Sequence, residues 1–527
     1  MIGDDPVADA RSERQRREVA YEEFKRRALE AGDAGRAADS LYWAFVAADT
    51  AYRYHLGRCA DPALERLLRE LGPTICAEHP LEGRRPSARG DDGRRRLVHL
   101  LSGTVGGGHI AVVQQWVSAL CHRGGYEQHL LSTELTPGRR GLRAISDEVA
   151  SSRHAPPGLT PDSRVRWTIE ELAAIDPDFV VLHVDPADVF AICAADQYRR
   201  MAGAPLYFFN HADVLFSVGP SLADYVVHYR RASARYSLAY RFLHLSQIRF
   251  APLGAGPEGP PEGPLPARHP GATASVTVAN YYKLMPDGHW DFAEMLSQLL
   301  LREPEHYHLM VGDGHAVQRI RLRRALRRLP RSARARVLWL GHRSDLGELM
   351  RSTDFLIESC PFPGGVVRAH ALRCGLPVVA VRHQWPLLSD TDALEPDYSL
   401  WASSNEEMVD LASRLIRDPA SRRQTGAALA RRYHERFSEA LLADAIERVL
   451  SGEPGPERRE LPGGHPGYEP DYLLRYSGPI PGPGALARRA QARIGYPPVG
   501  IRGRALRQFD RGLSALRMLA GSRSQGS

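Results

Sequence analysis

The sequence of 527 residues has little cysteine, almost no lysine and no long apolar segment. No apolar run reaches the roughly 18–20 residues that a membrane-spanning helix needs, and the N-terminus lacks the apolar core of a secretory signal. The six cysteines are scattered without a CxxC pair, which argues against a zinc site and against a disulfide framework. These absences predict a cytoplasmic protein.

Lysine occurs only at Lys25 and Lys283, although lysine and arginine together number 69. Against this arginine-rich background, an internal lysine is a candidate for a specific role. The formal net charge is +7, and nine arginines between residues 488 and 527 supply nearly all of the excess. The remaining chain is close to neutral, which argues against a nucleic-acid-binding protein, whose domains carry a basic face.

Changes of pattern divide the sequence into four segments. Apolar residues recur at helical spacing over 12–71, as in stacked helical hairpins, and Asp61 stands where it can cap a helix. From Leu97 onward, short apolar runs alternate with helical patterns, and the alternation restarts after a Pro/Gly-rich linker at 253–271. We therefore expect an α/β fold with a helical N-terminal extension (1–92), two tandem Rossmann-like domains (93–256 and 272–452) and a Pro/Gly-rich basic tail (453–527).

The apolar runs predict the strands of two parallel sheets covered by helices. In the first domain they lie at 97–104, 126–135, 178–186, 204–213 and 225–230. In the second domain they lie at 275–283, 306–314, 336–343, 355–362 and 377–382.

A glycine loop stands between the first strand and the first helix of the first domain. Gly106, Gly107 and Gly108 precede His109, and a helix start offers backbone N–H groups to an anion or a polar oxygen. The segment lacks the clean third glycine of a dinucleotide-binding fingerprint, so NAD is not expected. We interpret it as an acceptor or phosphate loop, and a tight turn without a ligand is the alternative.

The tetrapeptide Asn-His-Ala-Asp follows the apolar strand PLYFF. Sites in open α/β sheets lie beyond the carboxyl ends of the strands, so His211 and Asp213 are candidate catalytic residues. His211 could hydrogen-bond a substrate hydroxyl or act as a base near neutral pH. The alternative is a structural histidine.

In the second domain, polar or glycine-rich segments follow successive strands and are candidates for binding phosphate or ribose. Lys283 ends the first strand, and a Pro-Gly-Gly segment leads into a later helix N-terminus. The full set of candidates is Lys283, Gly312, Asp313, Gly314, His342, Arg343, Pro363, Gly364, Gly365, Val366 and His370.

The ordered series VANYYK, VGDG, GHR and FPGGVVRAHALRCGLPVVA resembles the C-terminal nucleotide-binding domain of GT-B glycosyltransferases, with the likeness covering about 97–450. This resemblance implies a nucleotide-sugar in the second domain, an acceptor mainly in the first, and chemistry in the cleft between them. The segment YYKLMP is similar to the phosphate-lysine segment of O-linked N-acetylglucosamine transferases, which also join helical repeats to a GT-B core. That similarity favours an inverting displacement.

One departure concerns a pair of glutamates. Retaining members of this large group carry two glutamates separated by seven residues, where this sequence has Phe362 and His370. Glu358 lies too early to replace the first. The usual glutamate contact to ribose is therefore not expected here.

The sequence as a whole predicts a hexosyl- or N-acetylhexosaminyltransferase that uses a UDP- or GDP-sugar as co-substrate, with no cofactor and no metal. The acceptor is open: a glycan, lipid, protein or small molecule. Two alternatives remain, a nucleotide-sugar epimerase of the same fold and a degenerate GT-B domain that only binds.

The tail supports a further expectation, because apolar residues recur there at helical spacing with arginines beside them. Such a helix is typical of peripheral contact with an anionic membrane surface, here the inner face. Packing of this helix on the protein is the alternative. The apolar residues are Leu506, Phe509, Leu513 and Leu516.

Overall fold

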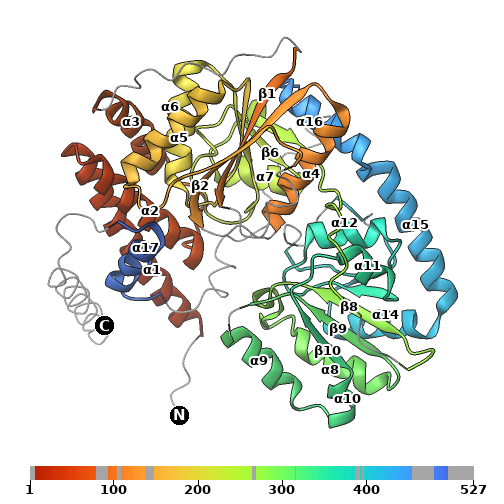
Figure 1. Cartoon of the computed structure of the whole chain (residues 1–527). Coiled ribbons are helices and arrows are strands. Elements are labelled where there is room, and N and C mark those ends of the chain that lie inside the picture. Colours follow the sequence, from red (N-terminus) through yellow and green to blue (C-terminus); the bar gives the residue numbers. More distant parts are fainter. Residues whose placement is uncertain are drawn as a thin grey trace, which may run out of the picture.

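A computed structural model describes residues 6–78, 93–103, 108–136, 147–263, 269–314, 316–385, 388, 392–394, 397–453 and 480–496. Within these residues the chain forms two helix-covered sheets, and a group of N-terminal helices packs on the first (Figure 1). The GT-B arrangement of two Rossmann-like domains with a helical extension, expected from the sequence, is confirmed.

The first sheet is parallel and has the strand order β3-β2-β1-β4-β5-β6-β7. The order begins as in a Rossmann sheet and reverses direction between β1 and β4, the place where ligands of such sheets bind. The sequence does not predict β3 or β7, because both are short and β3 has the polar sequence SSRH. The strands are β1 (Arg95–Gly103), β2 (Tyr126–Thr136), β3 (Ser151–His154), β4 (Phe179–His183), β5 (Leu206–Phe209), β6 (Tyr225–His228) and β7 (Ile248–Phe250).

The second sheet repeats this topology in the order β10-β9-β8-β11-β12-β13 and reverses between β8 and β11. All of its strands except the two-residue β13 fall, to within one residue, inside segments that the apolar runs predict. The strands are β8 (Ala274–Val278), β9 (Tyr307–Val311), β10 (Val337–Gly341), β11 (Phe355–Ile357), β12 (Val378–Val381) and β13 (Trp401–Ala402).

Helices cover both faces of each sheet. On the first sheet, α4 (Gly108–Arg123) packs on one face, α5 (Pro161–Ile175) and α6 (Val189–Ala202) on the other, and α7 (Arg231–Tyr240) follows β6. Around the second sheet lie α8 (Phe292–Arg302), α9 (Ala316–Leu326), α10 (Arg331–Ala335), α11 (Leu346–Arg351), α12 (Gly365–Arg373), α14 (Asn405–Arg417) and α15 (Pro419–Phe437).

The N-terminal extension consists of α1 (Pro6–Asp33), α2 (Ala37–Tyr54) and α3 (Pro62–Glu78). Asp61 caps α3 as expected, since its Oδ1 accepts hydrogen bonds from the backbone N–H groups of Ala63 and Leu64 at 2.9 and 3.2 Å. The buried side chains of α2 and α3 belong to the same apolar cluster as α5, α6 and one face of the first sheet. The extension therefore shares a core with the first domain and is held rigidly against it.

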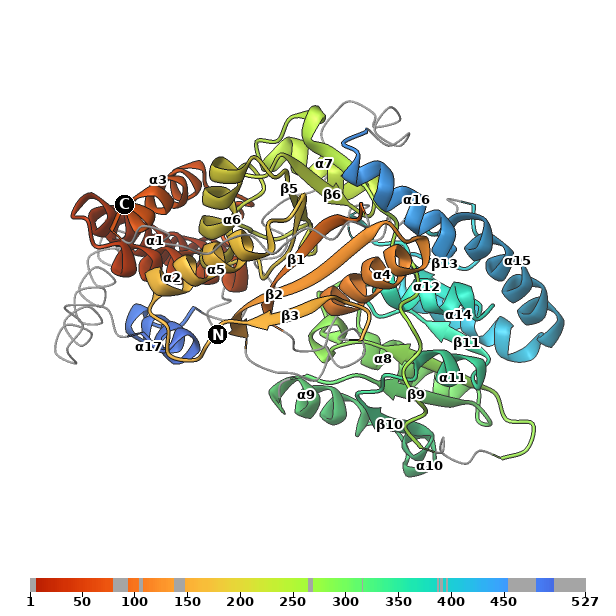
Figure 2. The same ribbon diagram turned by 45° about the horizontal axis from the view of Figure 1, so that its top comes forward.

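After the second domain, the chain returns to the first domain. After α15, helix α16 (Glu439–Leu450) packs on α4, and its Leu442, Ile446 and Val449 share a cluster with Trp116. Figure 2 shows α15 and α16 running along one side of both domains. The first domain is thus completed by a helix that follows the second domain in sequence.

Residues 480–496 of the basic tail dock on the extension through α17 (Pro483–Ile494). Tyr42 Oη donates a hydrogen bond to the carbonyl of Ala487 at 2.7 Å, and Arg493 contacts Asp49 at 2.6 Å and Asp185 at 2.9 Å. The apolar stretch with Leu506 and Phe509 lies outside the described residues, so membrane contact stays a prediction from the sequence. None of the described helices is both long and apolar enough to cross a membrane.

A buried ion pair holds α12 against the second sheet. Arg368 on α12 donates from Nε to Glu358 Oε1 at 2.9 Å and from Nη2 to both carboxylate oxygens at 2.6 Å. Glu358 Oε2 also accepts the backbone N–H of Val381 at 2.9 Å. The pair therefore links the ends of β11 and β12 to the helix and fixes the position of the helix N-terminus.

We predict that Arg368→Met lowers the free energy of unfolding by about 3–5 kcal/mol, because it leaves the Glu358 carboxylate buried without a counter-charge. The double variant Glu358→Gln/Arg368→Met should recover most of this loss, since an amide oxygen still accepts the Val381 N–H. Urea denaturation measures both. Single and double variants of equal stability would contradict the role of the uncompensated charge.

Candidate functional site

The two sheets and the helical extension enclose a cavity of about 620 Å³, which we call the cleft. Residues that follow β5 and β6 of the first sheet face residues that follow β8 and β11 of the second. The cleft is lined by Tyr52, Arg53, Tyr54, His55, His211, Ala212, Asp213, Val214, Leu215, Tyr229, Arg230, Tyr282, Lys283, Gln318, Phe362, Pro363, Gly365, Leu388 and Arg489.

Both predicted catalytic residues line the first-domain side of the cleft. His211 Nε2 lies 3.1 Å from Nδ1 of the buried His183, and burial together with nearby His109 lowers the pKa of His211 well below its usual range. His211 is therefore neutral at neutral pH. Asp213 is buried, and its carboxylate accepts a hydrogen bond from Arg230 Nε at 2.5 Å. This ion pair gives Asp213 a charge partner inside the protein.

The loop after His211 is held by a second arginine. Arg241 is fully buried and donates from Nη2 to the carbonyls of Ala212 at 3.0 Å and Leu215 at 2.5 Å, and from Nη1 to Ser217 Oγ. A planar guanidinium can satisfy several acceptors at once without a change of conformation. It therefore holds the backbone of the 212–217 loop in place beside His211.

The glycine loop is described only in part, because Gly106 and Gly107 lie outside the described residues. Helix α4 begins at Gly108, and the ring centroid of His109 lies 6.1 Å from that of His211. The start of α4 is thus close to the candidate base, as expected for a loop at the carboxyl end of β1.

The second-domain side of the cleft brings together Lys283 and the start of α12. These segments follow β8 and β11, the adjacent strands at the reversal point of the sheet. Lys283 Nζ lies 3.4 Å from the carbonyl of Pro363, and a Cβ atom placed on Gly364 would lie 3.9 Å from the same ammonium. No described side chain caps α12 at Gly364, so its first N–H groups remain available to an anion.

The glycines of this side allow close approach of backbone segments. Gly312 has φ 127°, and a Cβ atom there would lie 2.0 Å from the carbonyl oxygen of Ala279, so only glycine fits. A Cβ atom on Gly314 would meet Tyr281 at 2.9 Å and Gln318, a cleft residue, at 3.1 Å. Asp313 is exposed between them, so the Gly-Asp-Gly turn lies at the margin of the cleft.

Of the predicted donor-binding residues, Lys283, Pro363 and Gly365 line the cleft, and the side chains of His342, Arg343 and His370 lie away from it. His342 is exposed, and Arg343 Nε donates to Asp345 Oδ1 at 2.7 Å, next to the interdomain linker. His370 is buried on the inner face of α12, where burial lowers its pKa to about 4, and Arg373 Nη2 lies 3.3 Å from its Nδ1. The structure therefore does not bring these side chains to Lys283. Val366, the second residue of α12, is half-buried beside Gly365.

The sequence does not predict that the helical extension contributes side chains to the cleft. The end of α2 supplies Tyr52, Arg53, Tyr54 and His55 to the cleft, and α17 supplies Arg489, whose Nη1 donates to Tyr54 Oη at 2.8 Å. His55 adopts a left-handed conformation, with φ 49°, where it ends α2. Such a conformation is uncommon outside glycine. Tyr54 and Arg489 are too far apart in sequence for any motif to connect them.

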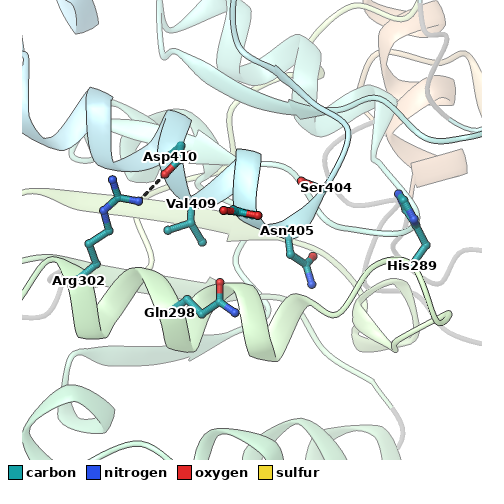
Figure 3. Close-up of a pocket in the computed structure, with 8 residues that line it drawn as sticks. His289, Gln298, Arg302, Ser404, Asn405, Val409 and Asp410 are labelled. Atoms are coloured by element: carbon teal, nitrogen blue, oxygen red, sulfur yellow. Dashed lines mark hydrogen bonds and ion pairs between the residues drawn. The ribbon is translucent and has the colours of Figure 1, made fainter.

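A second cavity, of about 660 Å³, lies on the outer face of the second domain between α8 and α14 (Figure 3). Arg302 of α8 forms an ion pair with Asp410 of α14 across it, and His289 hydrogen-bonds the carbonyl of Ser403 at 2.9 Å. It contains none of the predicted site residues, and its Arg302 and Asp410 are paired with each other. The cleft is therefore the better candidate for the active site.

Comparison with known proteins agrees with this geometry. Residues 273–418 match the family model for glycosyl transferases group 1. Anabaena Alr3699/HepE in complex with UDP and glucose is similar at 16% identity, over 68% of this chain and 100% of that chain, with a TM-score of 0.53. A glycosyltransferase from Rickettsia africae ESF-5 is similar at 11% identity, over 68% and 98%, with a TM-score of 0.53.

A mutant O-GlcNAc transferase from Thermobaculum terrenum aligns at 16% identity over 87% of this chain and 83% of that chain, with a TM-score of 0.47. Comparison with curated protein sequences finds no match. Residues 273–418 are thus similar to the glycosyl transferases group 1, and the two sheet domains have the GT-B fold.

Proposed function

We propose that this protein is a glycosyltransferase that transfers a sugar from a nucleotide diphosphate-sugar to a hydroxyl-bearing acceptor. The observation that carries the proposal is the meeting of Lys283 with the uncapped N-terminus of α12 in the cleft, opposite His211. The family match of residues 273–418 and the structural likeness to Anabaena Alr3699/HepE, whose structure contains UDP and glucose, support a nucleotide-sugar donor.

The diphosphate of the donor would bind between Lys283 and the first turn of α12. An ammonium group offers a point charge to phosphate, and the N–H groups of Gly365 and Val366 add directed hydrogen bonds. Both also stabilise the charge that develops on the leaving nucleoside diphosphate. Since Glu358 is bound by Arg368, its carboxylate is not available to ribose, and His370, at the position of the second glutamate, is buried away from the cleft.

The acceptor would bind on the side of the cleft formed by the first domain and the extension. Tyr54 and Arg489 are hydrogen-bonded to each other there, and Tyr52 and His55 lie beside them. Aromatic rings and arginines offer both apolar surface and hydrogen-bond donors to a polar ligand. Because α2 is fixed by a shared core, this surface is preformed.

The direct test is turnover with a panel of UDP- and GDP-sugars, each with and without candidate glycan, lipid, peptide and small-molecule acceptors. We expect release of the nucleoside diphosphate with one donor, together with a glycosylated product when the acceptor is present. Conversion of the donor to an epimer without any acceptor would establish an epimerase instead. Failure of every nucleotide and nucleotide-sugar to raise the melting temperature would contradict the proposed donor site.

Lys283→Ala should weaken binding of the nucleoside diphosphate roughly tenfold to a hundredfold, because it removes a charge-assisted hydrogen bond of about 1.5–3 kcal/mol. Isothermal titration calorimetry measures this change. Arg324→Ala is the matched control, since it removes an exposed positive charge from α9 outside the cleft. Equal affinities of Lys283→Ala and the control would remove Lys283 from the donor site.

His211→Ala should lower kcat about 100-fold or more, as expected for loss of a general base, while nucleotide affinity stays unchanged. Steady-state kinetics at saturating donor separates the two effects. The control is His122→Ala, which removes an exposed histidine at the end of α4 in the same domain. A His211→Ala variant with wild-type kcat would assign His211 a purely structural role.

A further inference from the structure

His211 is the outer end of a line of hydrogen-bonded side chains that crosses the first sheet. His211 Nε2 lies 3.1 Å from His183 Nδ1, and His183 Nε2 lies 3.3 Å from His99 Nδ1. His99 Nε2 in turn lies 3.1 Å from Gln128 Oε1. We call these four residues the histidine chain. His183, His99 and Gln128 belong to β4, β1 and β2, and His211 follows β5, so the four residues have the same order as these strands in the sheet.

The inner members of the histidine chain are sealed from solvent. His99, His183 and Gln128 are all almost completely buried, and only His211 reaches the cleft. Trp116 packs edge-on against His99 and His183, with ring centroids 6.5 and 5.7 Å apart, and Phe209 stacks on His183 at 5.5 Å. Because apolar rings surround them, the ring nitrogens form hydrogen bonds mainly with one another. The donor and acceptor of one hydrogen bond therefore determine the donor and acceptor of the next.

Gln128 sets the direction of these hydrogen bonds. Its Nε2 donates to the carbonyl of Val117 at 3.0 Å and lies 3.3 Å from Cys121 Sγ, so its Oε1 must be the atom that faces His99. An amide oxygen only accepts hydrogen bonds. His99 Nε2 therefore carries a hydrogen.

The remaining tautomers follow from the chemistry of neutral imidazole, which has one N–H and one lone pair. Burial lowers the pKa of His99 to about 4 and that of His183 well below its usual range, so both are neutral at neutral pH. His99 Nδ1 then accepts from His183 Nε2, and His183 Nδ1 accepts from His211 Nε2. The lone pair of His211 is left on Nδ1, which has no hydrogen-bond partner among the described residues.

We propose that Gln128, His99 and His183 are positioning residues that fix His211 in the Nε2–H tautomer, so that its Nδ1 accepts the hydrogen of the acceptor hydroxyl. This inference rests on the proposed function. In the transfer step, the acceptor O–H proton moves to His211 Nδ1 while the acceptor oxygen bonds to the anomeric carbon. The bond from that carbon to the diphosphate oxygen breaks, and its electron pair leaves on the nucleoside diphosphate.

The histidine chain also explains why the proton stops at His211. Protonated His211 still donates through Nε2 to His183, so the chain need not rearrange when the base is charged. Gln128 cannot take up a proton, so the interior offers no final acceptor for one. The proton is therefore returned to the cleft once the product leaves.

The first test is the tautomer of His211 itself, read by NMR of nitrogen-labelled histidine in the full chain. The two ring nitrogens of His211 are identified by their absence from spectra of His211→Ala. We expect Nε2 to be protonated and Nδ1 to be unprotonated at neutral pH. Protonation at Nδ1 instead would overturn the proposal, whatever the enzymatic activity.

The second test compares two substitutions of Gln128. In Gln128→Leu, the hydrogen of His99 Nε2 would have no acceptor. A buried unpaired N–H costs more than a buried unpaired lone pair, so each hydrogen bond between the histidines should then be donated in the opposite direction. His211 then carries its hydrogen on Nδ1, and kcat should fall about tenfold with the KM for the donor unchanged. In Gln128→Glu a carboxyl oxygen still accepts from His99, so kcat should stay close to wild type.

His129→Asn on the same strand is the control for local disturbance, because His129 hydrogen-bonds Ser151 and not the histidine chain. Equal kcat values for Gln128→Leu and Gln128→Glu, with the same His211 tautomer in both, would overturn the proposal. A wild-type protein without transferase activity but with the expected His211 tautomer would contradict the proposed function and leave the arrangement of the histidine chain standing.

Discussion

The direction of the parallel strands is the constraint on which this molecule depends. Every strand of a parallel sheet ends at the same edge, and here the ending edges of both sheets meet at the cleft. Residues as distant as His211, Lys283 and Pro363 are gathered because each follows such a strand. The ion pair between Glu358 and Arg368 then holds the first turn of α12 at this edge, so the backbone N–H groups of that turn are already in place beside the cleft.

The sequence predicts the sheets well because buried parallel strands appear as continuous apolar runs. Lys283, Pro363 and Gly365, which the sequence singles out near strand ends, line the cleft, since strand ends can be recognised locally. Local pattern says less about which way a side chain faces. His370 occupies a motif position but lies on the buried face of α12, and Arg343 is held by Asp345 beside the linker.

Long-range packing accounts for the rest of what the sequence does not predict. The contact between Tyr54 and Arg489, and the docking of α17 on α2, join the two ends of the described chain. The histidine chain has the same character. His99 and His183 each stand as a single polar residue in an apolar run, Gln128 stands between Glu127 and His129, and only the strand order of the sheet makes the three neighbours.

The return of α16 to the first domain has a mechanical consequence. The polypeptide passes between the domains twice, once through the segment after β7 and once between α15 and α16. Both passages are anchored: Gly254 N–H donates to Gln115 at 3.0 Å, Ala255 N–H donates to Tyr433 at 3.0 Å, and α16 is buried against α4. Two anchored connections restrict rotation of one domain against the other more than a single connection would.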